Sequence, residues 1–229
     1  MSTLPHQDAS QLAGTIVGEL DALPVKNTPS ARAVRRNYTR LLRAWEGAHA
    51  LAVAEALAAH PRWRWVGYEL LLDHPGAFSL LDAGRIEALG RGMADWGTVD
   101  CFGRTISGPA WLHGLLSDAD IARWAASEDR WWRRAALVST VALNTRSQGG
   151  PGDAPRTLAV CRMLAADRDD MVVKAMSWAL RKLAEREPDA VRAFLAEQAD
   201  ALAARARREV NHKLATGLKN PRRNLSGVS

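Results

Sequence analysis

The chain contains little cysteine and few of the motifs that mark cofactor sites. Only Cys101 and Cys161 occur among 229 residues, without a CxxC pair, which implies neither a disulfide framework nor a zinc ribbon and favours a reducing compartment. The six histidines form no HxxxH or HExxH spacing, so a helical zinc site is not predicted. The sequences GxGxxG, GxxxxGKS and GxxxxGKT are also missing, which excludes a Rossmann fingerprint and a phosphate loop.

Long apolar runs and strand-like patterns are equally scarce. No stretch approaches the roughly 20 apolar residues that span a bilayer, and the start, MSTLPHQDASQLAGTIV, lacks a basic region followed by an apolar run. We therefore expect a soluble, cytoplasmic protein with no membrane partner. Period-two alternation is almost absent, whereas helical periodicity runs along most of the chain. The predicted fold class is all-α.

From about residue 62 the chain reads as helix pairs of unequal length without a strict sequence period. This is typical of a HEAT-like helical repeat solenoid, with a compact helical bundle as the alternative. We predict a single domain over residues 1–219 and a disordered tail over 220–229. Helix breaks are predicted at residues 24–30, 60–61, 74–76, 108–109, 148–155 and 187–188.

The charge balance favours a polyanionic partner. Lysine and arginine number 31 against 25 acidic residues, a formal net charge of +6. The segment SARAVRRNYTRLLRAW carries five arginines and no acid before Glu46, and a helical wheel places Arg32, Arg36, Arg40 and Arg43 opposite the apolar side. This stripe is interpreted as a phosphate-contacting surface, or alternatively as a solvated helix face. A second basic cluster is interpreted as an extension of the same surface, or alternatively as a frayed basic tail, and comprises Arg205, Arg207, Arg208, Lys213, Lys219, Arg222 and Arg223.

Tryptophan is over-represented, with nine residues against two tyrosines and three phenylalanines. Most of the nine are expected to pack in the core: Trp63, Trp65, Trp111, Trp124, Trp131 and Trp132. Two others have charged neighbours at helical spacing. Trp96 and Asp100 stand four residues apart, and Lys174, Trp178 and Arg181 follow at i, i+4 and i+7. A tryptophan flanked by cations suits packing against a nucleoside while the cations hold phosphates.

A third segment, RWWRRAALVS at residues 130–139, embeds arginines in an otherwise apolar helix. Such arginines need anionic partners or an exposed edge, and a salt bridge to a neighbouring helix is the alternative to a DNA contact.

Together these motifs resemble a known family. The ordered set WxxVD at 96–100, WWRRAA at 131–136 and VxKAxxWxLR at 172–181, preceded by Tyr68 and Glu69, is similar to the AlkD-type alkylpurine DNA glycosylases of the DNA alkylation repair family. The similarity covers roughly residues 62–216. In the N-terminal third, LPVKNTPSARAVRRNY stands where the family has an aromatic-rich FxxLGI-like turn.

The resemblance implies a crescent of HEAT-like repeats that holds duplex DNA containing alkylated bases. It implies that Trp96 and Trp178 line the cleft beside the lesion, that Asp100 is the catalytic carboxylate, and that Arg134 holds backbone phosphate. Glu69 matches the family pattern, but pairing with an arginine is the favoured interpretation. The predicted DNA-binding residues are Arg134, Arg181, Lys174, Arg133, Arg36 and Arg40.

The implied activity is hydrolysis of the N-glycosidic bond of N3- or N7-alkylated purines. A cationic purine leaves readily and produces an oxocarbenium-like sugar, which one carboxylate can stabilise while it orients water. This chemistry requires no metal, nucleotide cofactor or nucleophilic triad, and a monomer is expected. The alternative function is a non-catalytic HEAT-like module that binds duplex or branched DNA.

Overall fold

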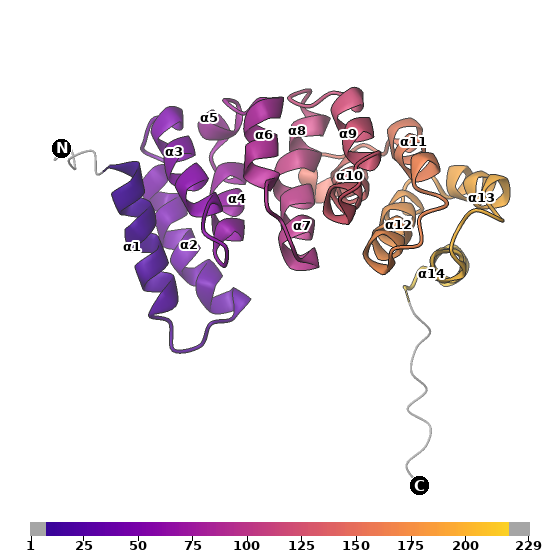
Figure 1. Ribbon diagram of the computed structural model, residues 1–229, viewed down its shortest axis with the longest axis horizontal. Helices are drawn as coiled ribbons and strands as arrows, with labels where there is room; N and C mark the ends of the chain where they lie inside the picture. Colours follow the sequence, from indigo (N-terminus) through magenta and orange to yellow (C-terminus); the bar gives the residue numbers. More distant parts are fainter. Residues whose placement is uncertain (1–7, 220–229) are drawn as a thin grey trace, which may run out of the picture. The chain divides into compact units, whose positions relative to one another are not determined.

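The computed structural model describes residues 8–219, and every regular element within that range is a helix (Figure 1). The all-α prediction is therefore confirmed for the described residues. Packing contacts divide the chain into two compact units, residues 1–110 and 111–229. The single domain over 1–219 stays a prediction, and the predicted disordered tail lies outside the described residues.

The first unit consists of short helices that pack against their neighbours in the chain. α3 lies against α1 and α4, and α4 also contacts α2 and α7. Gly67 permits the close approach of α4 to α3, because a Cβ atom there would lie 2.5 Å from the carbonyl oxygen of Ala54. The elements are α1 (Ala9–Asp21), α2 (Thr28–Leu42), α3 (Gly47–Ala58), α4 (Arg64–Leu72), α5 (Pro75–Phe78), α6 (Ala83–Gly90), α7 (Trp96–Phe102), the π-helical turn η1 (Gly103–Ser107) and α8 (Gly108–Leu112), which leads into the second unit.

The second unit continues the same pattern of neighbouring helices. α10 packs on α9, α11 and α12, and α12 packs on α11, α13 and α14. Such a succession of neighbour contacts is consistent with the predicted HEAT-like repeat fold. The elements are α9 (Asp118–Ala125), α10 (Arg130–Leu143), the 3₁₀ turn η2 (Arg146–Gln148), α11 (Ala154–Met163), α12 (Asp170–Leu183), α13 (Pro188–Glu197) and α14 (Ala204–Thr216).

Capping aspartates fix where many of the helices begin. A carboxylate on the N-cap, the residue just before the helix, accepts a hydrogen bond from a backbone N–H in the first turn. That N–H has no partner within the helix, and the negative charge interacts favourably with the positive end of the helix. The residues that do this are Asp82, Asp95, Asp129, Asp153 and Asp169.

One predicted helix break is wrong. Gly108 and Pro109 do not interrupt the chain, because α7, η1 and α8 follow one another without a gap. A proline inside a helix lacks an N–H and clashes with the carbonyl one turn earlier. The π-helical turn directly before Pro109 is the local change in helical winding that accompanies the proline, and the N–H of Gly108 donates to the carbonyl of Gly103, five residues back. Each of the other predicted breaks coincides with a junction between helices, although those at 24–30, 74–76, 148–155 and 187–188 also include the first residues of the helix that follows.

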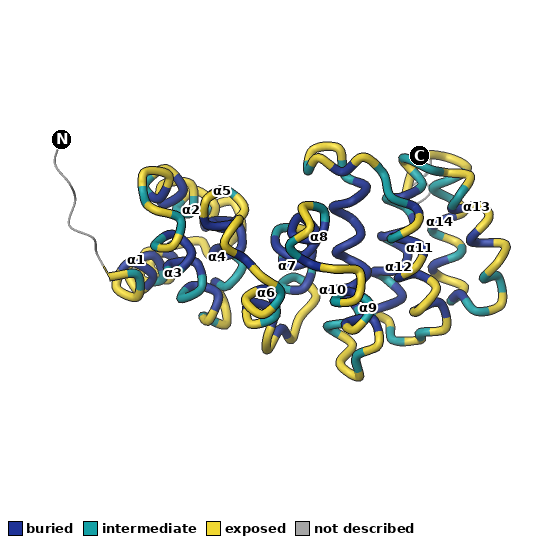
Figure 2. Tube along the Cα trace, turned by 90° about the horizontal axis from the view of Figure 1, so that it is seen from above, coloured by how far each residue is buried: buried dark blue, intermediate teal, exposed yellow. Residues whose placement is uncertain are grey.

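The apolar core of the second unit is centred on α10. Every residue from Arg134 to Leu143 is buried, and the tube is dark blue along most of this helix in Figure 2. The packing prediction is confirmed for Trp63, Trp111 and Trp124, which are buried. Trp65, Trp131 and Trp132 are only half-buried and keep an accessible edge.

Candidate functional site

α7 carries the first pair of predicted site residues. Trp96 is its first residue and Asp100 lies one turn later, while Val99 and Phe102 are buried. Trp96 is 61% exposed, an unusually accessible indole, and Asp100 is half-buried. The helix therefore presents the indole and the carboxylate away from its packed side, as the spacing predicted.

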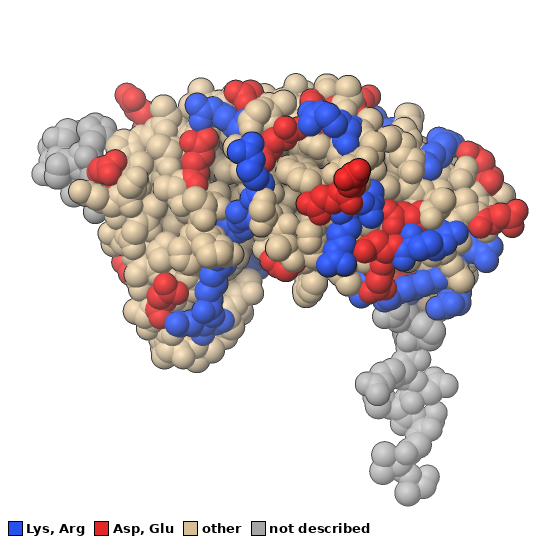
Figure 3. Space-filling view, in the orientation of Figure 1, with Lys and Arg blue, Asp and Glu red and all other residues tan. Residues whose placement is uncertain are grey.

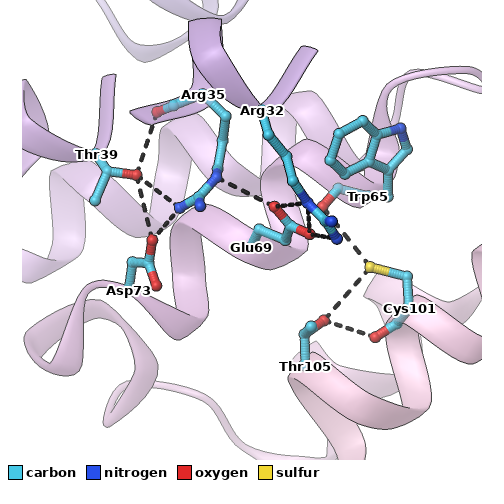
Figure 4. Close-up of polar contacts among 8 residues, drawn as sticks. All are labelled: Arg32, Arg35, Thr39, Trp65, Glu69, Asp73, Cys101 and Thr105. Carbon is cyan, nitrogen blue, oxygen red and sulfur yellow. Dashed lines mark hydrogen bonds and ion pairs between the residues drawn. The ribbon is translucent and has the colours of Figure 1, made fainter. Parts of the chain in front are cut away.

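The arginine stripe of α2 is divided between two environments. Arg32 and Arg35 turn toward α4, where both pair with the buried carboxylate of Glu69 (Figure 4). The shortest contact from Arg32 is 2.5 Å, and Arg35 also pairs with Asp73. The predicted pairing of Glu69 with an arginine is thus confirmed, and these two arginines hold α2 to α4.

Arg36 and Arg40 remain on the exposed side of α2. Arg40 donates a hydrogen bond of 2.5 Å to the side-chain oxygen of Asn37, which neutralises no charge. The four arginines of the predicted stripe are all exposed, although Arg32 also pairs with Glu69, so their cations are accessible to a polyanion.

Cys101 follows Asp100 and packs its thiol against α4. Its Sγ lies 4.0 Å from the carbonyl oxygen of Trp65 and 3.8 Å from the hydroxyl of Thr105 (Figure 4). Burial raises the pKa of this thiol to about 12 and outweighs the opposite effect of the Thr105 hydrogen bond. The thiol is therefore protonated at neutral pH and serves packing rather than nucleophilic chemistry.

α12 carries the second set of predicted residues. Lys174, Trp178 and Arg181 are half-buried, whereas the residues immediately flanking Trp178 are fully buried. The three side chains thus form the predicted common face of α12. Lys174 Nζ lies 2.5 Å from a carboxylate oxygen of Asp170, one turn earlier on the same helix.

Arg181 is held by its own helix and by α14. Its Nε donates to Ser177 Oγ at 3.1 Å and lies 3.9 Å from Glu209 Oε2, and its side chain is only 14% exposed. Burial lowers the pKa of Arg181, and the charges of Glu209 and Glu185 act in the opposite direction. Around α12 and α14 the visible surface mixes basic and acidic side chains (Figure 3).

The two adjacent arginines of α10 also bind oxygen atoms of the protein. Arg133 Nε lies 2.8 Å from Asp167 Oδ2, and its Nη1 donates to the carbonyls of Ser127 and Glu128. Arg134 is 5% exposed and donates to the main-chain carbonyl of Met171, which ties α10 to the first turn of α12. The salt-bridge alternative therefore holds for Arg133, while the sequence did not predict the depth at which Arg134 lies.

The acidic partners of these cations and the residues that fix α7 were not predicted from the sequence. Asp167 lies 34 residues from Arg133, and Glu209 lies on α14 whereas Arg181 lies on α12, so no local spacing indicates these two pairings. Asp95 and Thr98 do have a local signal, an aspartate three residues before a threonine at a helix start.

The surface features of α2, α7 and α12 indicate a class of protein. An exposed indole on α7, exposed arginines on α2 and cations beside a half-buried indole on α12 are features suited to bind a polyanion such as nucleic acid. Within residues 8–219, none of the helices combines the length and the apolar character that crossing a bilayer requires.

Comparison with known families gives the more specific assignment. The sequence profile of the family described as DNA alkylation repair enzyme matches residues 26–214, so the chain belongs to this family. Membership places the protein in the repair of alkylated DNA and implies DNA as its partner. Neither the curated proteins nor the solved structures contain a significant match to the chain.

Proposed function

We propose that the protein is a DNA glycosylase that releases N3- and N7-alkylated purines from duplex DNA. The observation that carries the proposal is the pairing on α7 of a strongly exposed indole, Trp96, with a carboxylate one turn later, Asp100. Membership in the DNA alkylation repair family supports the substrate class.

In the proposed reaction the alkylated base carries a positive charge and is already a good leaving group. The glycosidic bond breaks with its electron pair going to the base, which leaves an oxocarbenium-like sugar. Asp100 stabilises this sugar cation electrostatically and accepts a hydrogen bond from the attacking water. The water oxygen then bonds to the anomeric carbon and loses a proton, which gives an abasic site and the free base.

Trp96 and Trp178 are proposed to contact the lesion nucleotide through their indole faces. An electron-rich face attracts a positive sugar or base, and such contacts contribute roughly 0.5 to 2 kcal/mol each. The exposure of Trp96 and the half-buried position of Trp178 on α12 are compatible with this role.

For DNA binding, Arg36, Arg40 and Lys174 are proposed as direct phosphate contacts. Arg36 and Arg40 are exposed, and the partner of Lys174 is an exposed carboxylate that a phosphate can replace. Arg133, Arg134 and Arg181 already bind protein oxygens, so contact with phosphate requires them to share or exchange those partners. Their proposed contribution to DNA binding includes holding α10, α12 and α14 in place.

The test is the incubation of the protein with duplex DNA carrying N7-methylguanine or N3-methyladenine, with an unmodified duplex of the same sequence as the control. The proposal predicts free methylated base and abasic sites from the modified duplexes alone. Salt-sensitive DNA binding without any abasic product instead identifies a non-catalytic DNA-binding module.

A further inference from the structure

The start of α7 is held by two contacts between Asp95 and Thr98. One carboxylate oxygen of Asp95 accepts a hydrogen bond of 2.9 Å from the backbone N–H of Thr98. The other oxygen accepts a hydrogen bond of 2.6 Å from the hydroxyl of Thr98. Trp96 lies between these two residues in the chain, so both contacts hold the short backbone segment that carries the exposed indole.

α6 begins with the same local arrangement but lacks the second contact. Asp82 accepts a hydrogen bond of 2.8 Å from the N–H of Arg85, three residues later, and a glycine follows two residues after the aspartate in both helices. The remaining oxygen of Asp82 has only a 4.0 Å ion pair with the half-exposed Arg85. The two helix starts are therefore alike, except that in α7 the capping carboxylate also accepts a hydrogen bond from a side-chain hydroxyl. This pair of contacts between Asp95 and Thr98 is the side-chain clamp of α7.

The end of α7 is also fixed. Thr105, in the π-helical turn, donates a hydrogen bond of 2.7 Å to the carbonyl of Cys101, and the thiol of Cys101 contacts the carbonyl of Trp65 on α4. π-helical turns occur frequently at functional sites. α7 is seven residues long and continues directly into this turn, so the contacts at its start and at the turn hold the segment that carries Trp96 and Asp100.

We infer that Asp95 and Thr98 are positioning residues for the proposed base release, because together they fix the direction in which α7 presents Trp96 and Asp100. This inference rests on the proposed function. A displacement of about 1 Å in a reacting group can cost on the order of a hundredfold in rate while leaving binding almost intact. The clamp is therefore expected to affect the chemical step rather than DNA affinity.

The experiment measures the single-turnover rate of base release and the DNA dissociation constant for a duplex with one N7-methylguanine. The variants are Asp95→Ala, Asp95→Asn and Thr98→Val, with Asp82→Ala as the matched control. Asparagine is as good a helix cap as aspartate and keeps a group able to hydrogen-bond the threonine hydroxyl, so it preserves the geometry without the charge. Far-UV circular dichroism defines a temperature at which every variant is folded.

The inference predicts that Asp95→Ala slows release roughly tenfold to a hundredfold, with a dissociation constant within about twofold of the wild type. Thr98→Val, which leaves the backbone cap in place, is expected to lose about threefold to tenfold, whereas Asp95→Asn and Asp82→Ala stay close to the wild-type rate. If Asp95→Ala and Asp82→Ala release base equally fast, or if Asp95→Asn is as slow as Asp95→Ala, the positioning role is wrong. If the wild type itself releases no base, the proposed function fails and this role fails with it.

Discussion

Ser177 on α12 donates a hydrogen bond of 2.6 Å to Glu209 on α14. The same carboxylate accepts a hydrogen bond of 3.1 Å from Arg205 and lies 3.9 Å from Arg181. α14 therefore supplies the negative charge that holds Arg181 beside Trp178. This contact makes the proposed DNA-binding face of α12 dependent on α14, the helix that also carries Arg205, Arg207, Arg208 and Lys213 of the second basic cluster.

The first prediction concerns Glu209→Gln. Burial acts to raise the pKa of Glu209, but hydrogen bonds from Ser177 and Arg205 and nearby positive charges outweigh it, so its pKa lies below the ordinary value of 4.5. A carboxylate whose pKa is lower in the folded than in the unfolded protein stabilises the fold at pH values above its unfolded-state pKa. That contribution is lost as the pH falls through the folded-state pKa. We expect the variant to lose about 1 to 2 kcal/mol of unfolding free energy at pH 7.

The measurement is urea denaturation of the wild type and Glu209→Gln at pH 7 and at a series of values below 4.5. The difference in unfolding free energy between the two proteins is expected to shrink as the pH falls. Glu197→Gln is the control, because Glu197 also pairs with an arginine of another helix, Arg162, but its side chain is 44% exposed against 18% for Glu209. Equal losses in the two variants contradict the role of Glu209.

The second prediction concerns Glu69, which pairs with both Arg32 and Arg35. Replacing it with glutamine leaves the mostly buried guanidinium of Arg35 with Asp73 as its remaining carboxylate. Because Arg32 is half-exposed, the expected loss is reduced by solvent to roughly 2 to 3 kcal/mol. Thermal unfolding should show a clear loss of stability for Glu69→Gln and little change for Glu55→Gln. Glu55 is a suitable control because its partner, Arg85, is about as exposed as Arg32. If Glu69→Gln loses no more stability than Glu55→Gln, Glu69 is not the contact that holds α2 to α4.

The third prediction concerns the two thiols. Burial raises the pKa of both Cys101 and Cys161, so neither forms thiolate in the folded protein near neutral pH. At pH 8 the native protein is expected to react with a disulfide reagent such as DTNB far more slowly than free cysteine, and both thiols react once guanidinium unfolds the chain. A thiol that reacts in the native protein as fast as free cysteine contradicts this description.

The fourth prediction tests the exposed arginines of α2. The double substitution Arg36→Glu and Arg40→Glu should weaken binding to unmodified duplex DNA and reduce the slope of log affinity against log salt by about 2, near 0.9 for each phosphate contact. The control is Arg62→Glu with Arg192→Glu, which changes the net charge equally at exposed positions outside α2. Undiminished affinity in the first variant, or an equal loss in the control, excludes the stripe from the DNA-binding surface.

Much of the helical architecture could be predicted, because its signals are local. Apolar spacing and breaks such as the one at Pro188 lie within a few residues of the structures they specify. The continuous run through Pro109 could not be predicted, since it depends on a change of helical winding that no spacing rule indicates. The spacing within α7 and α12 correctly placed Trp96 with Asp100, and Trp178 with Lys174 and Arg181, on single helices.

The environment of the arginines was harder to predict. Arg32 and Arg36 are one turn apart on α2, yet Arg32 meets Glu69 from α4 while Arg36 stays exposed. The difference arises from packing between segments 37 residues apart in the chain, and the helical wheel carries no information about it. The same reason explains why Arg134 was expected at a surface and is buried.

The most direct test of the proposed function is the single-turnover release of N7-methylguanine from a defined duplex by the wild type, Asp100→Asn and the carboxylate control Asp82→Asn. We predict release by the wild type and by Asp82→Asn, and a loss of at least about a hundredfold in Asp100→Asn with DNA affinity retained. Release by Asp100→Asn at the wild-type rate, or by none of the three proteins, contradicts the account.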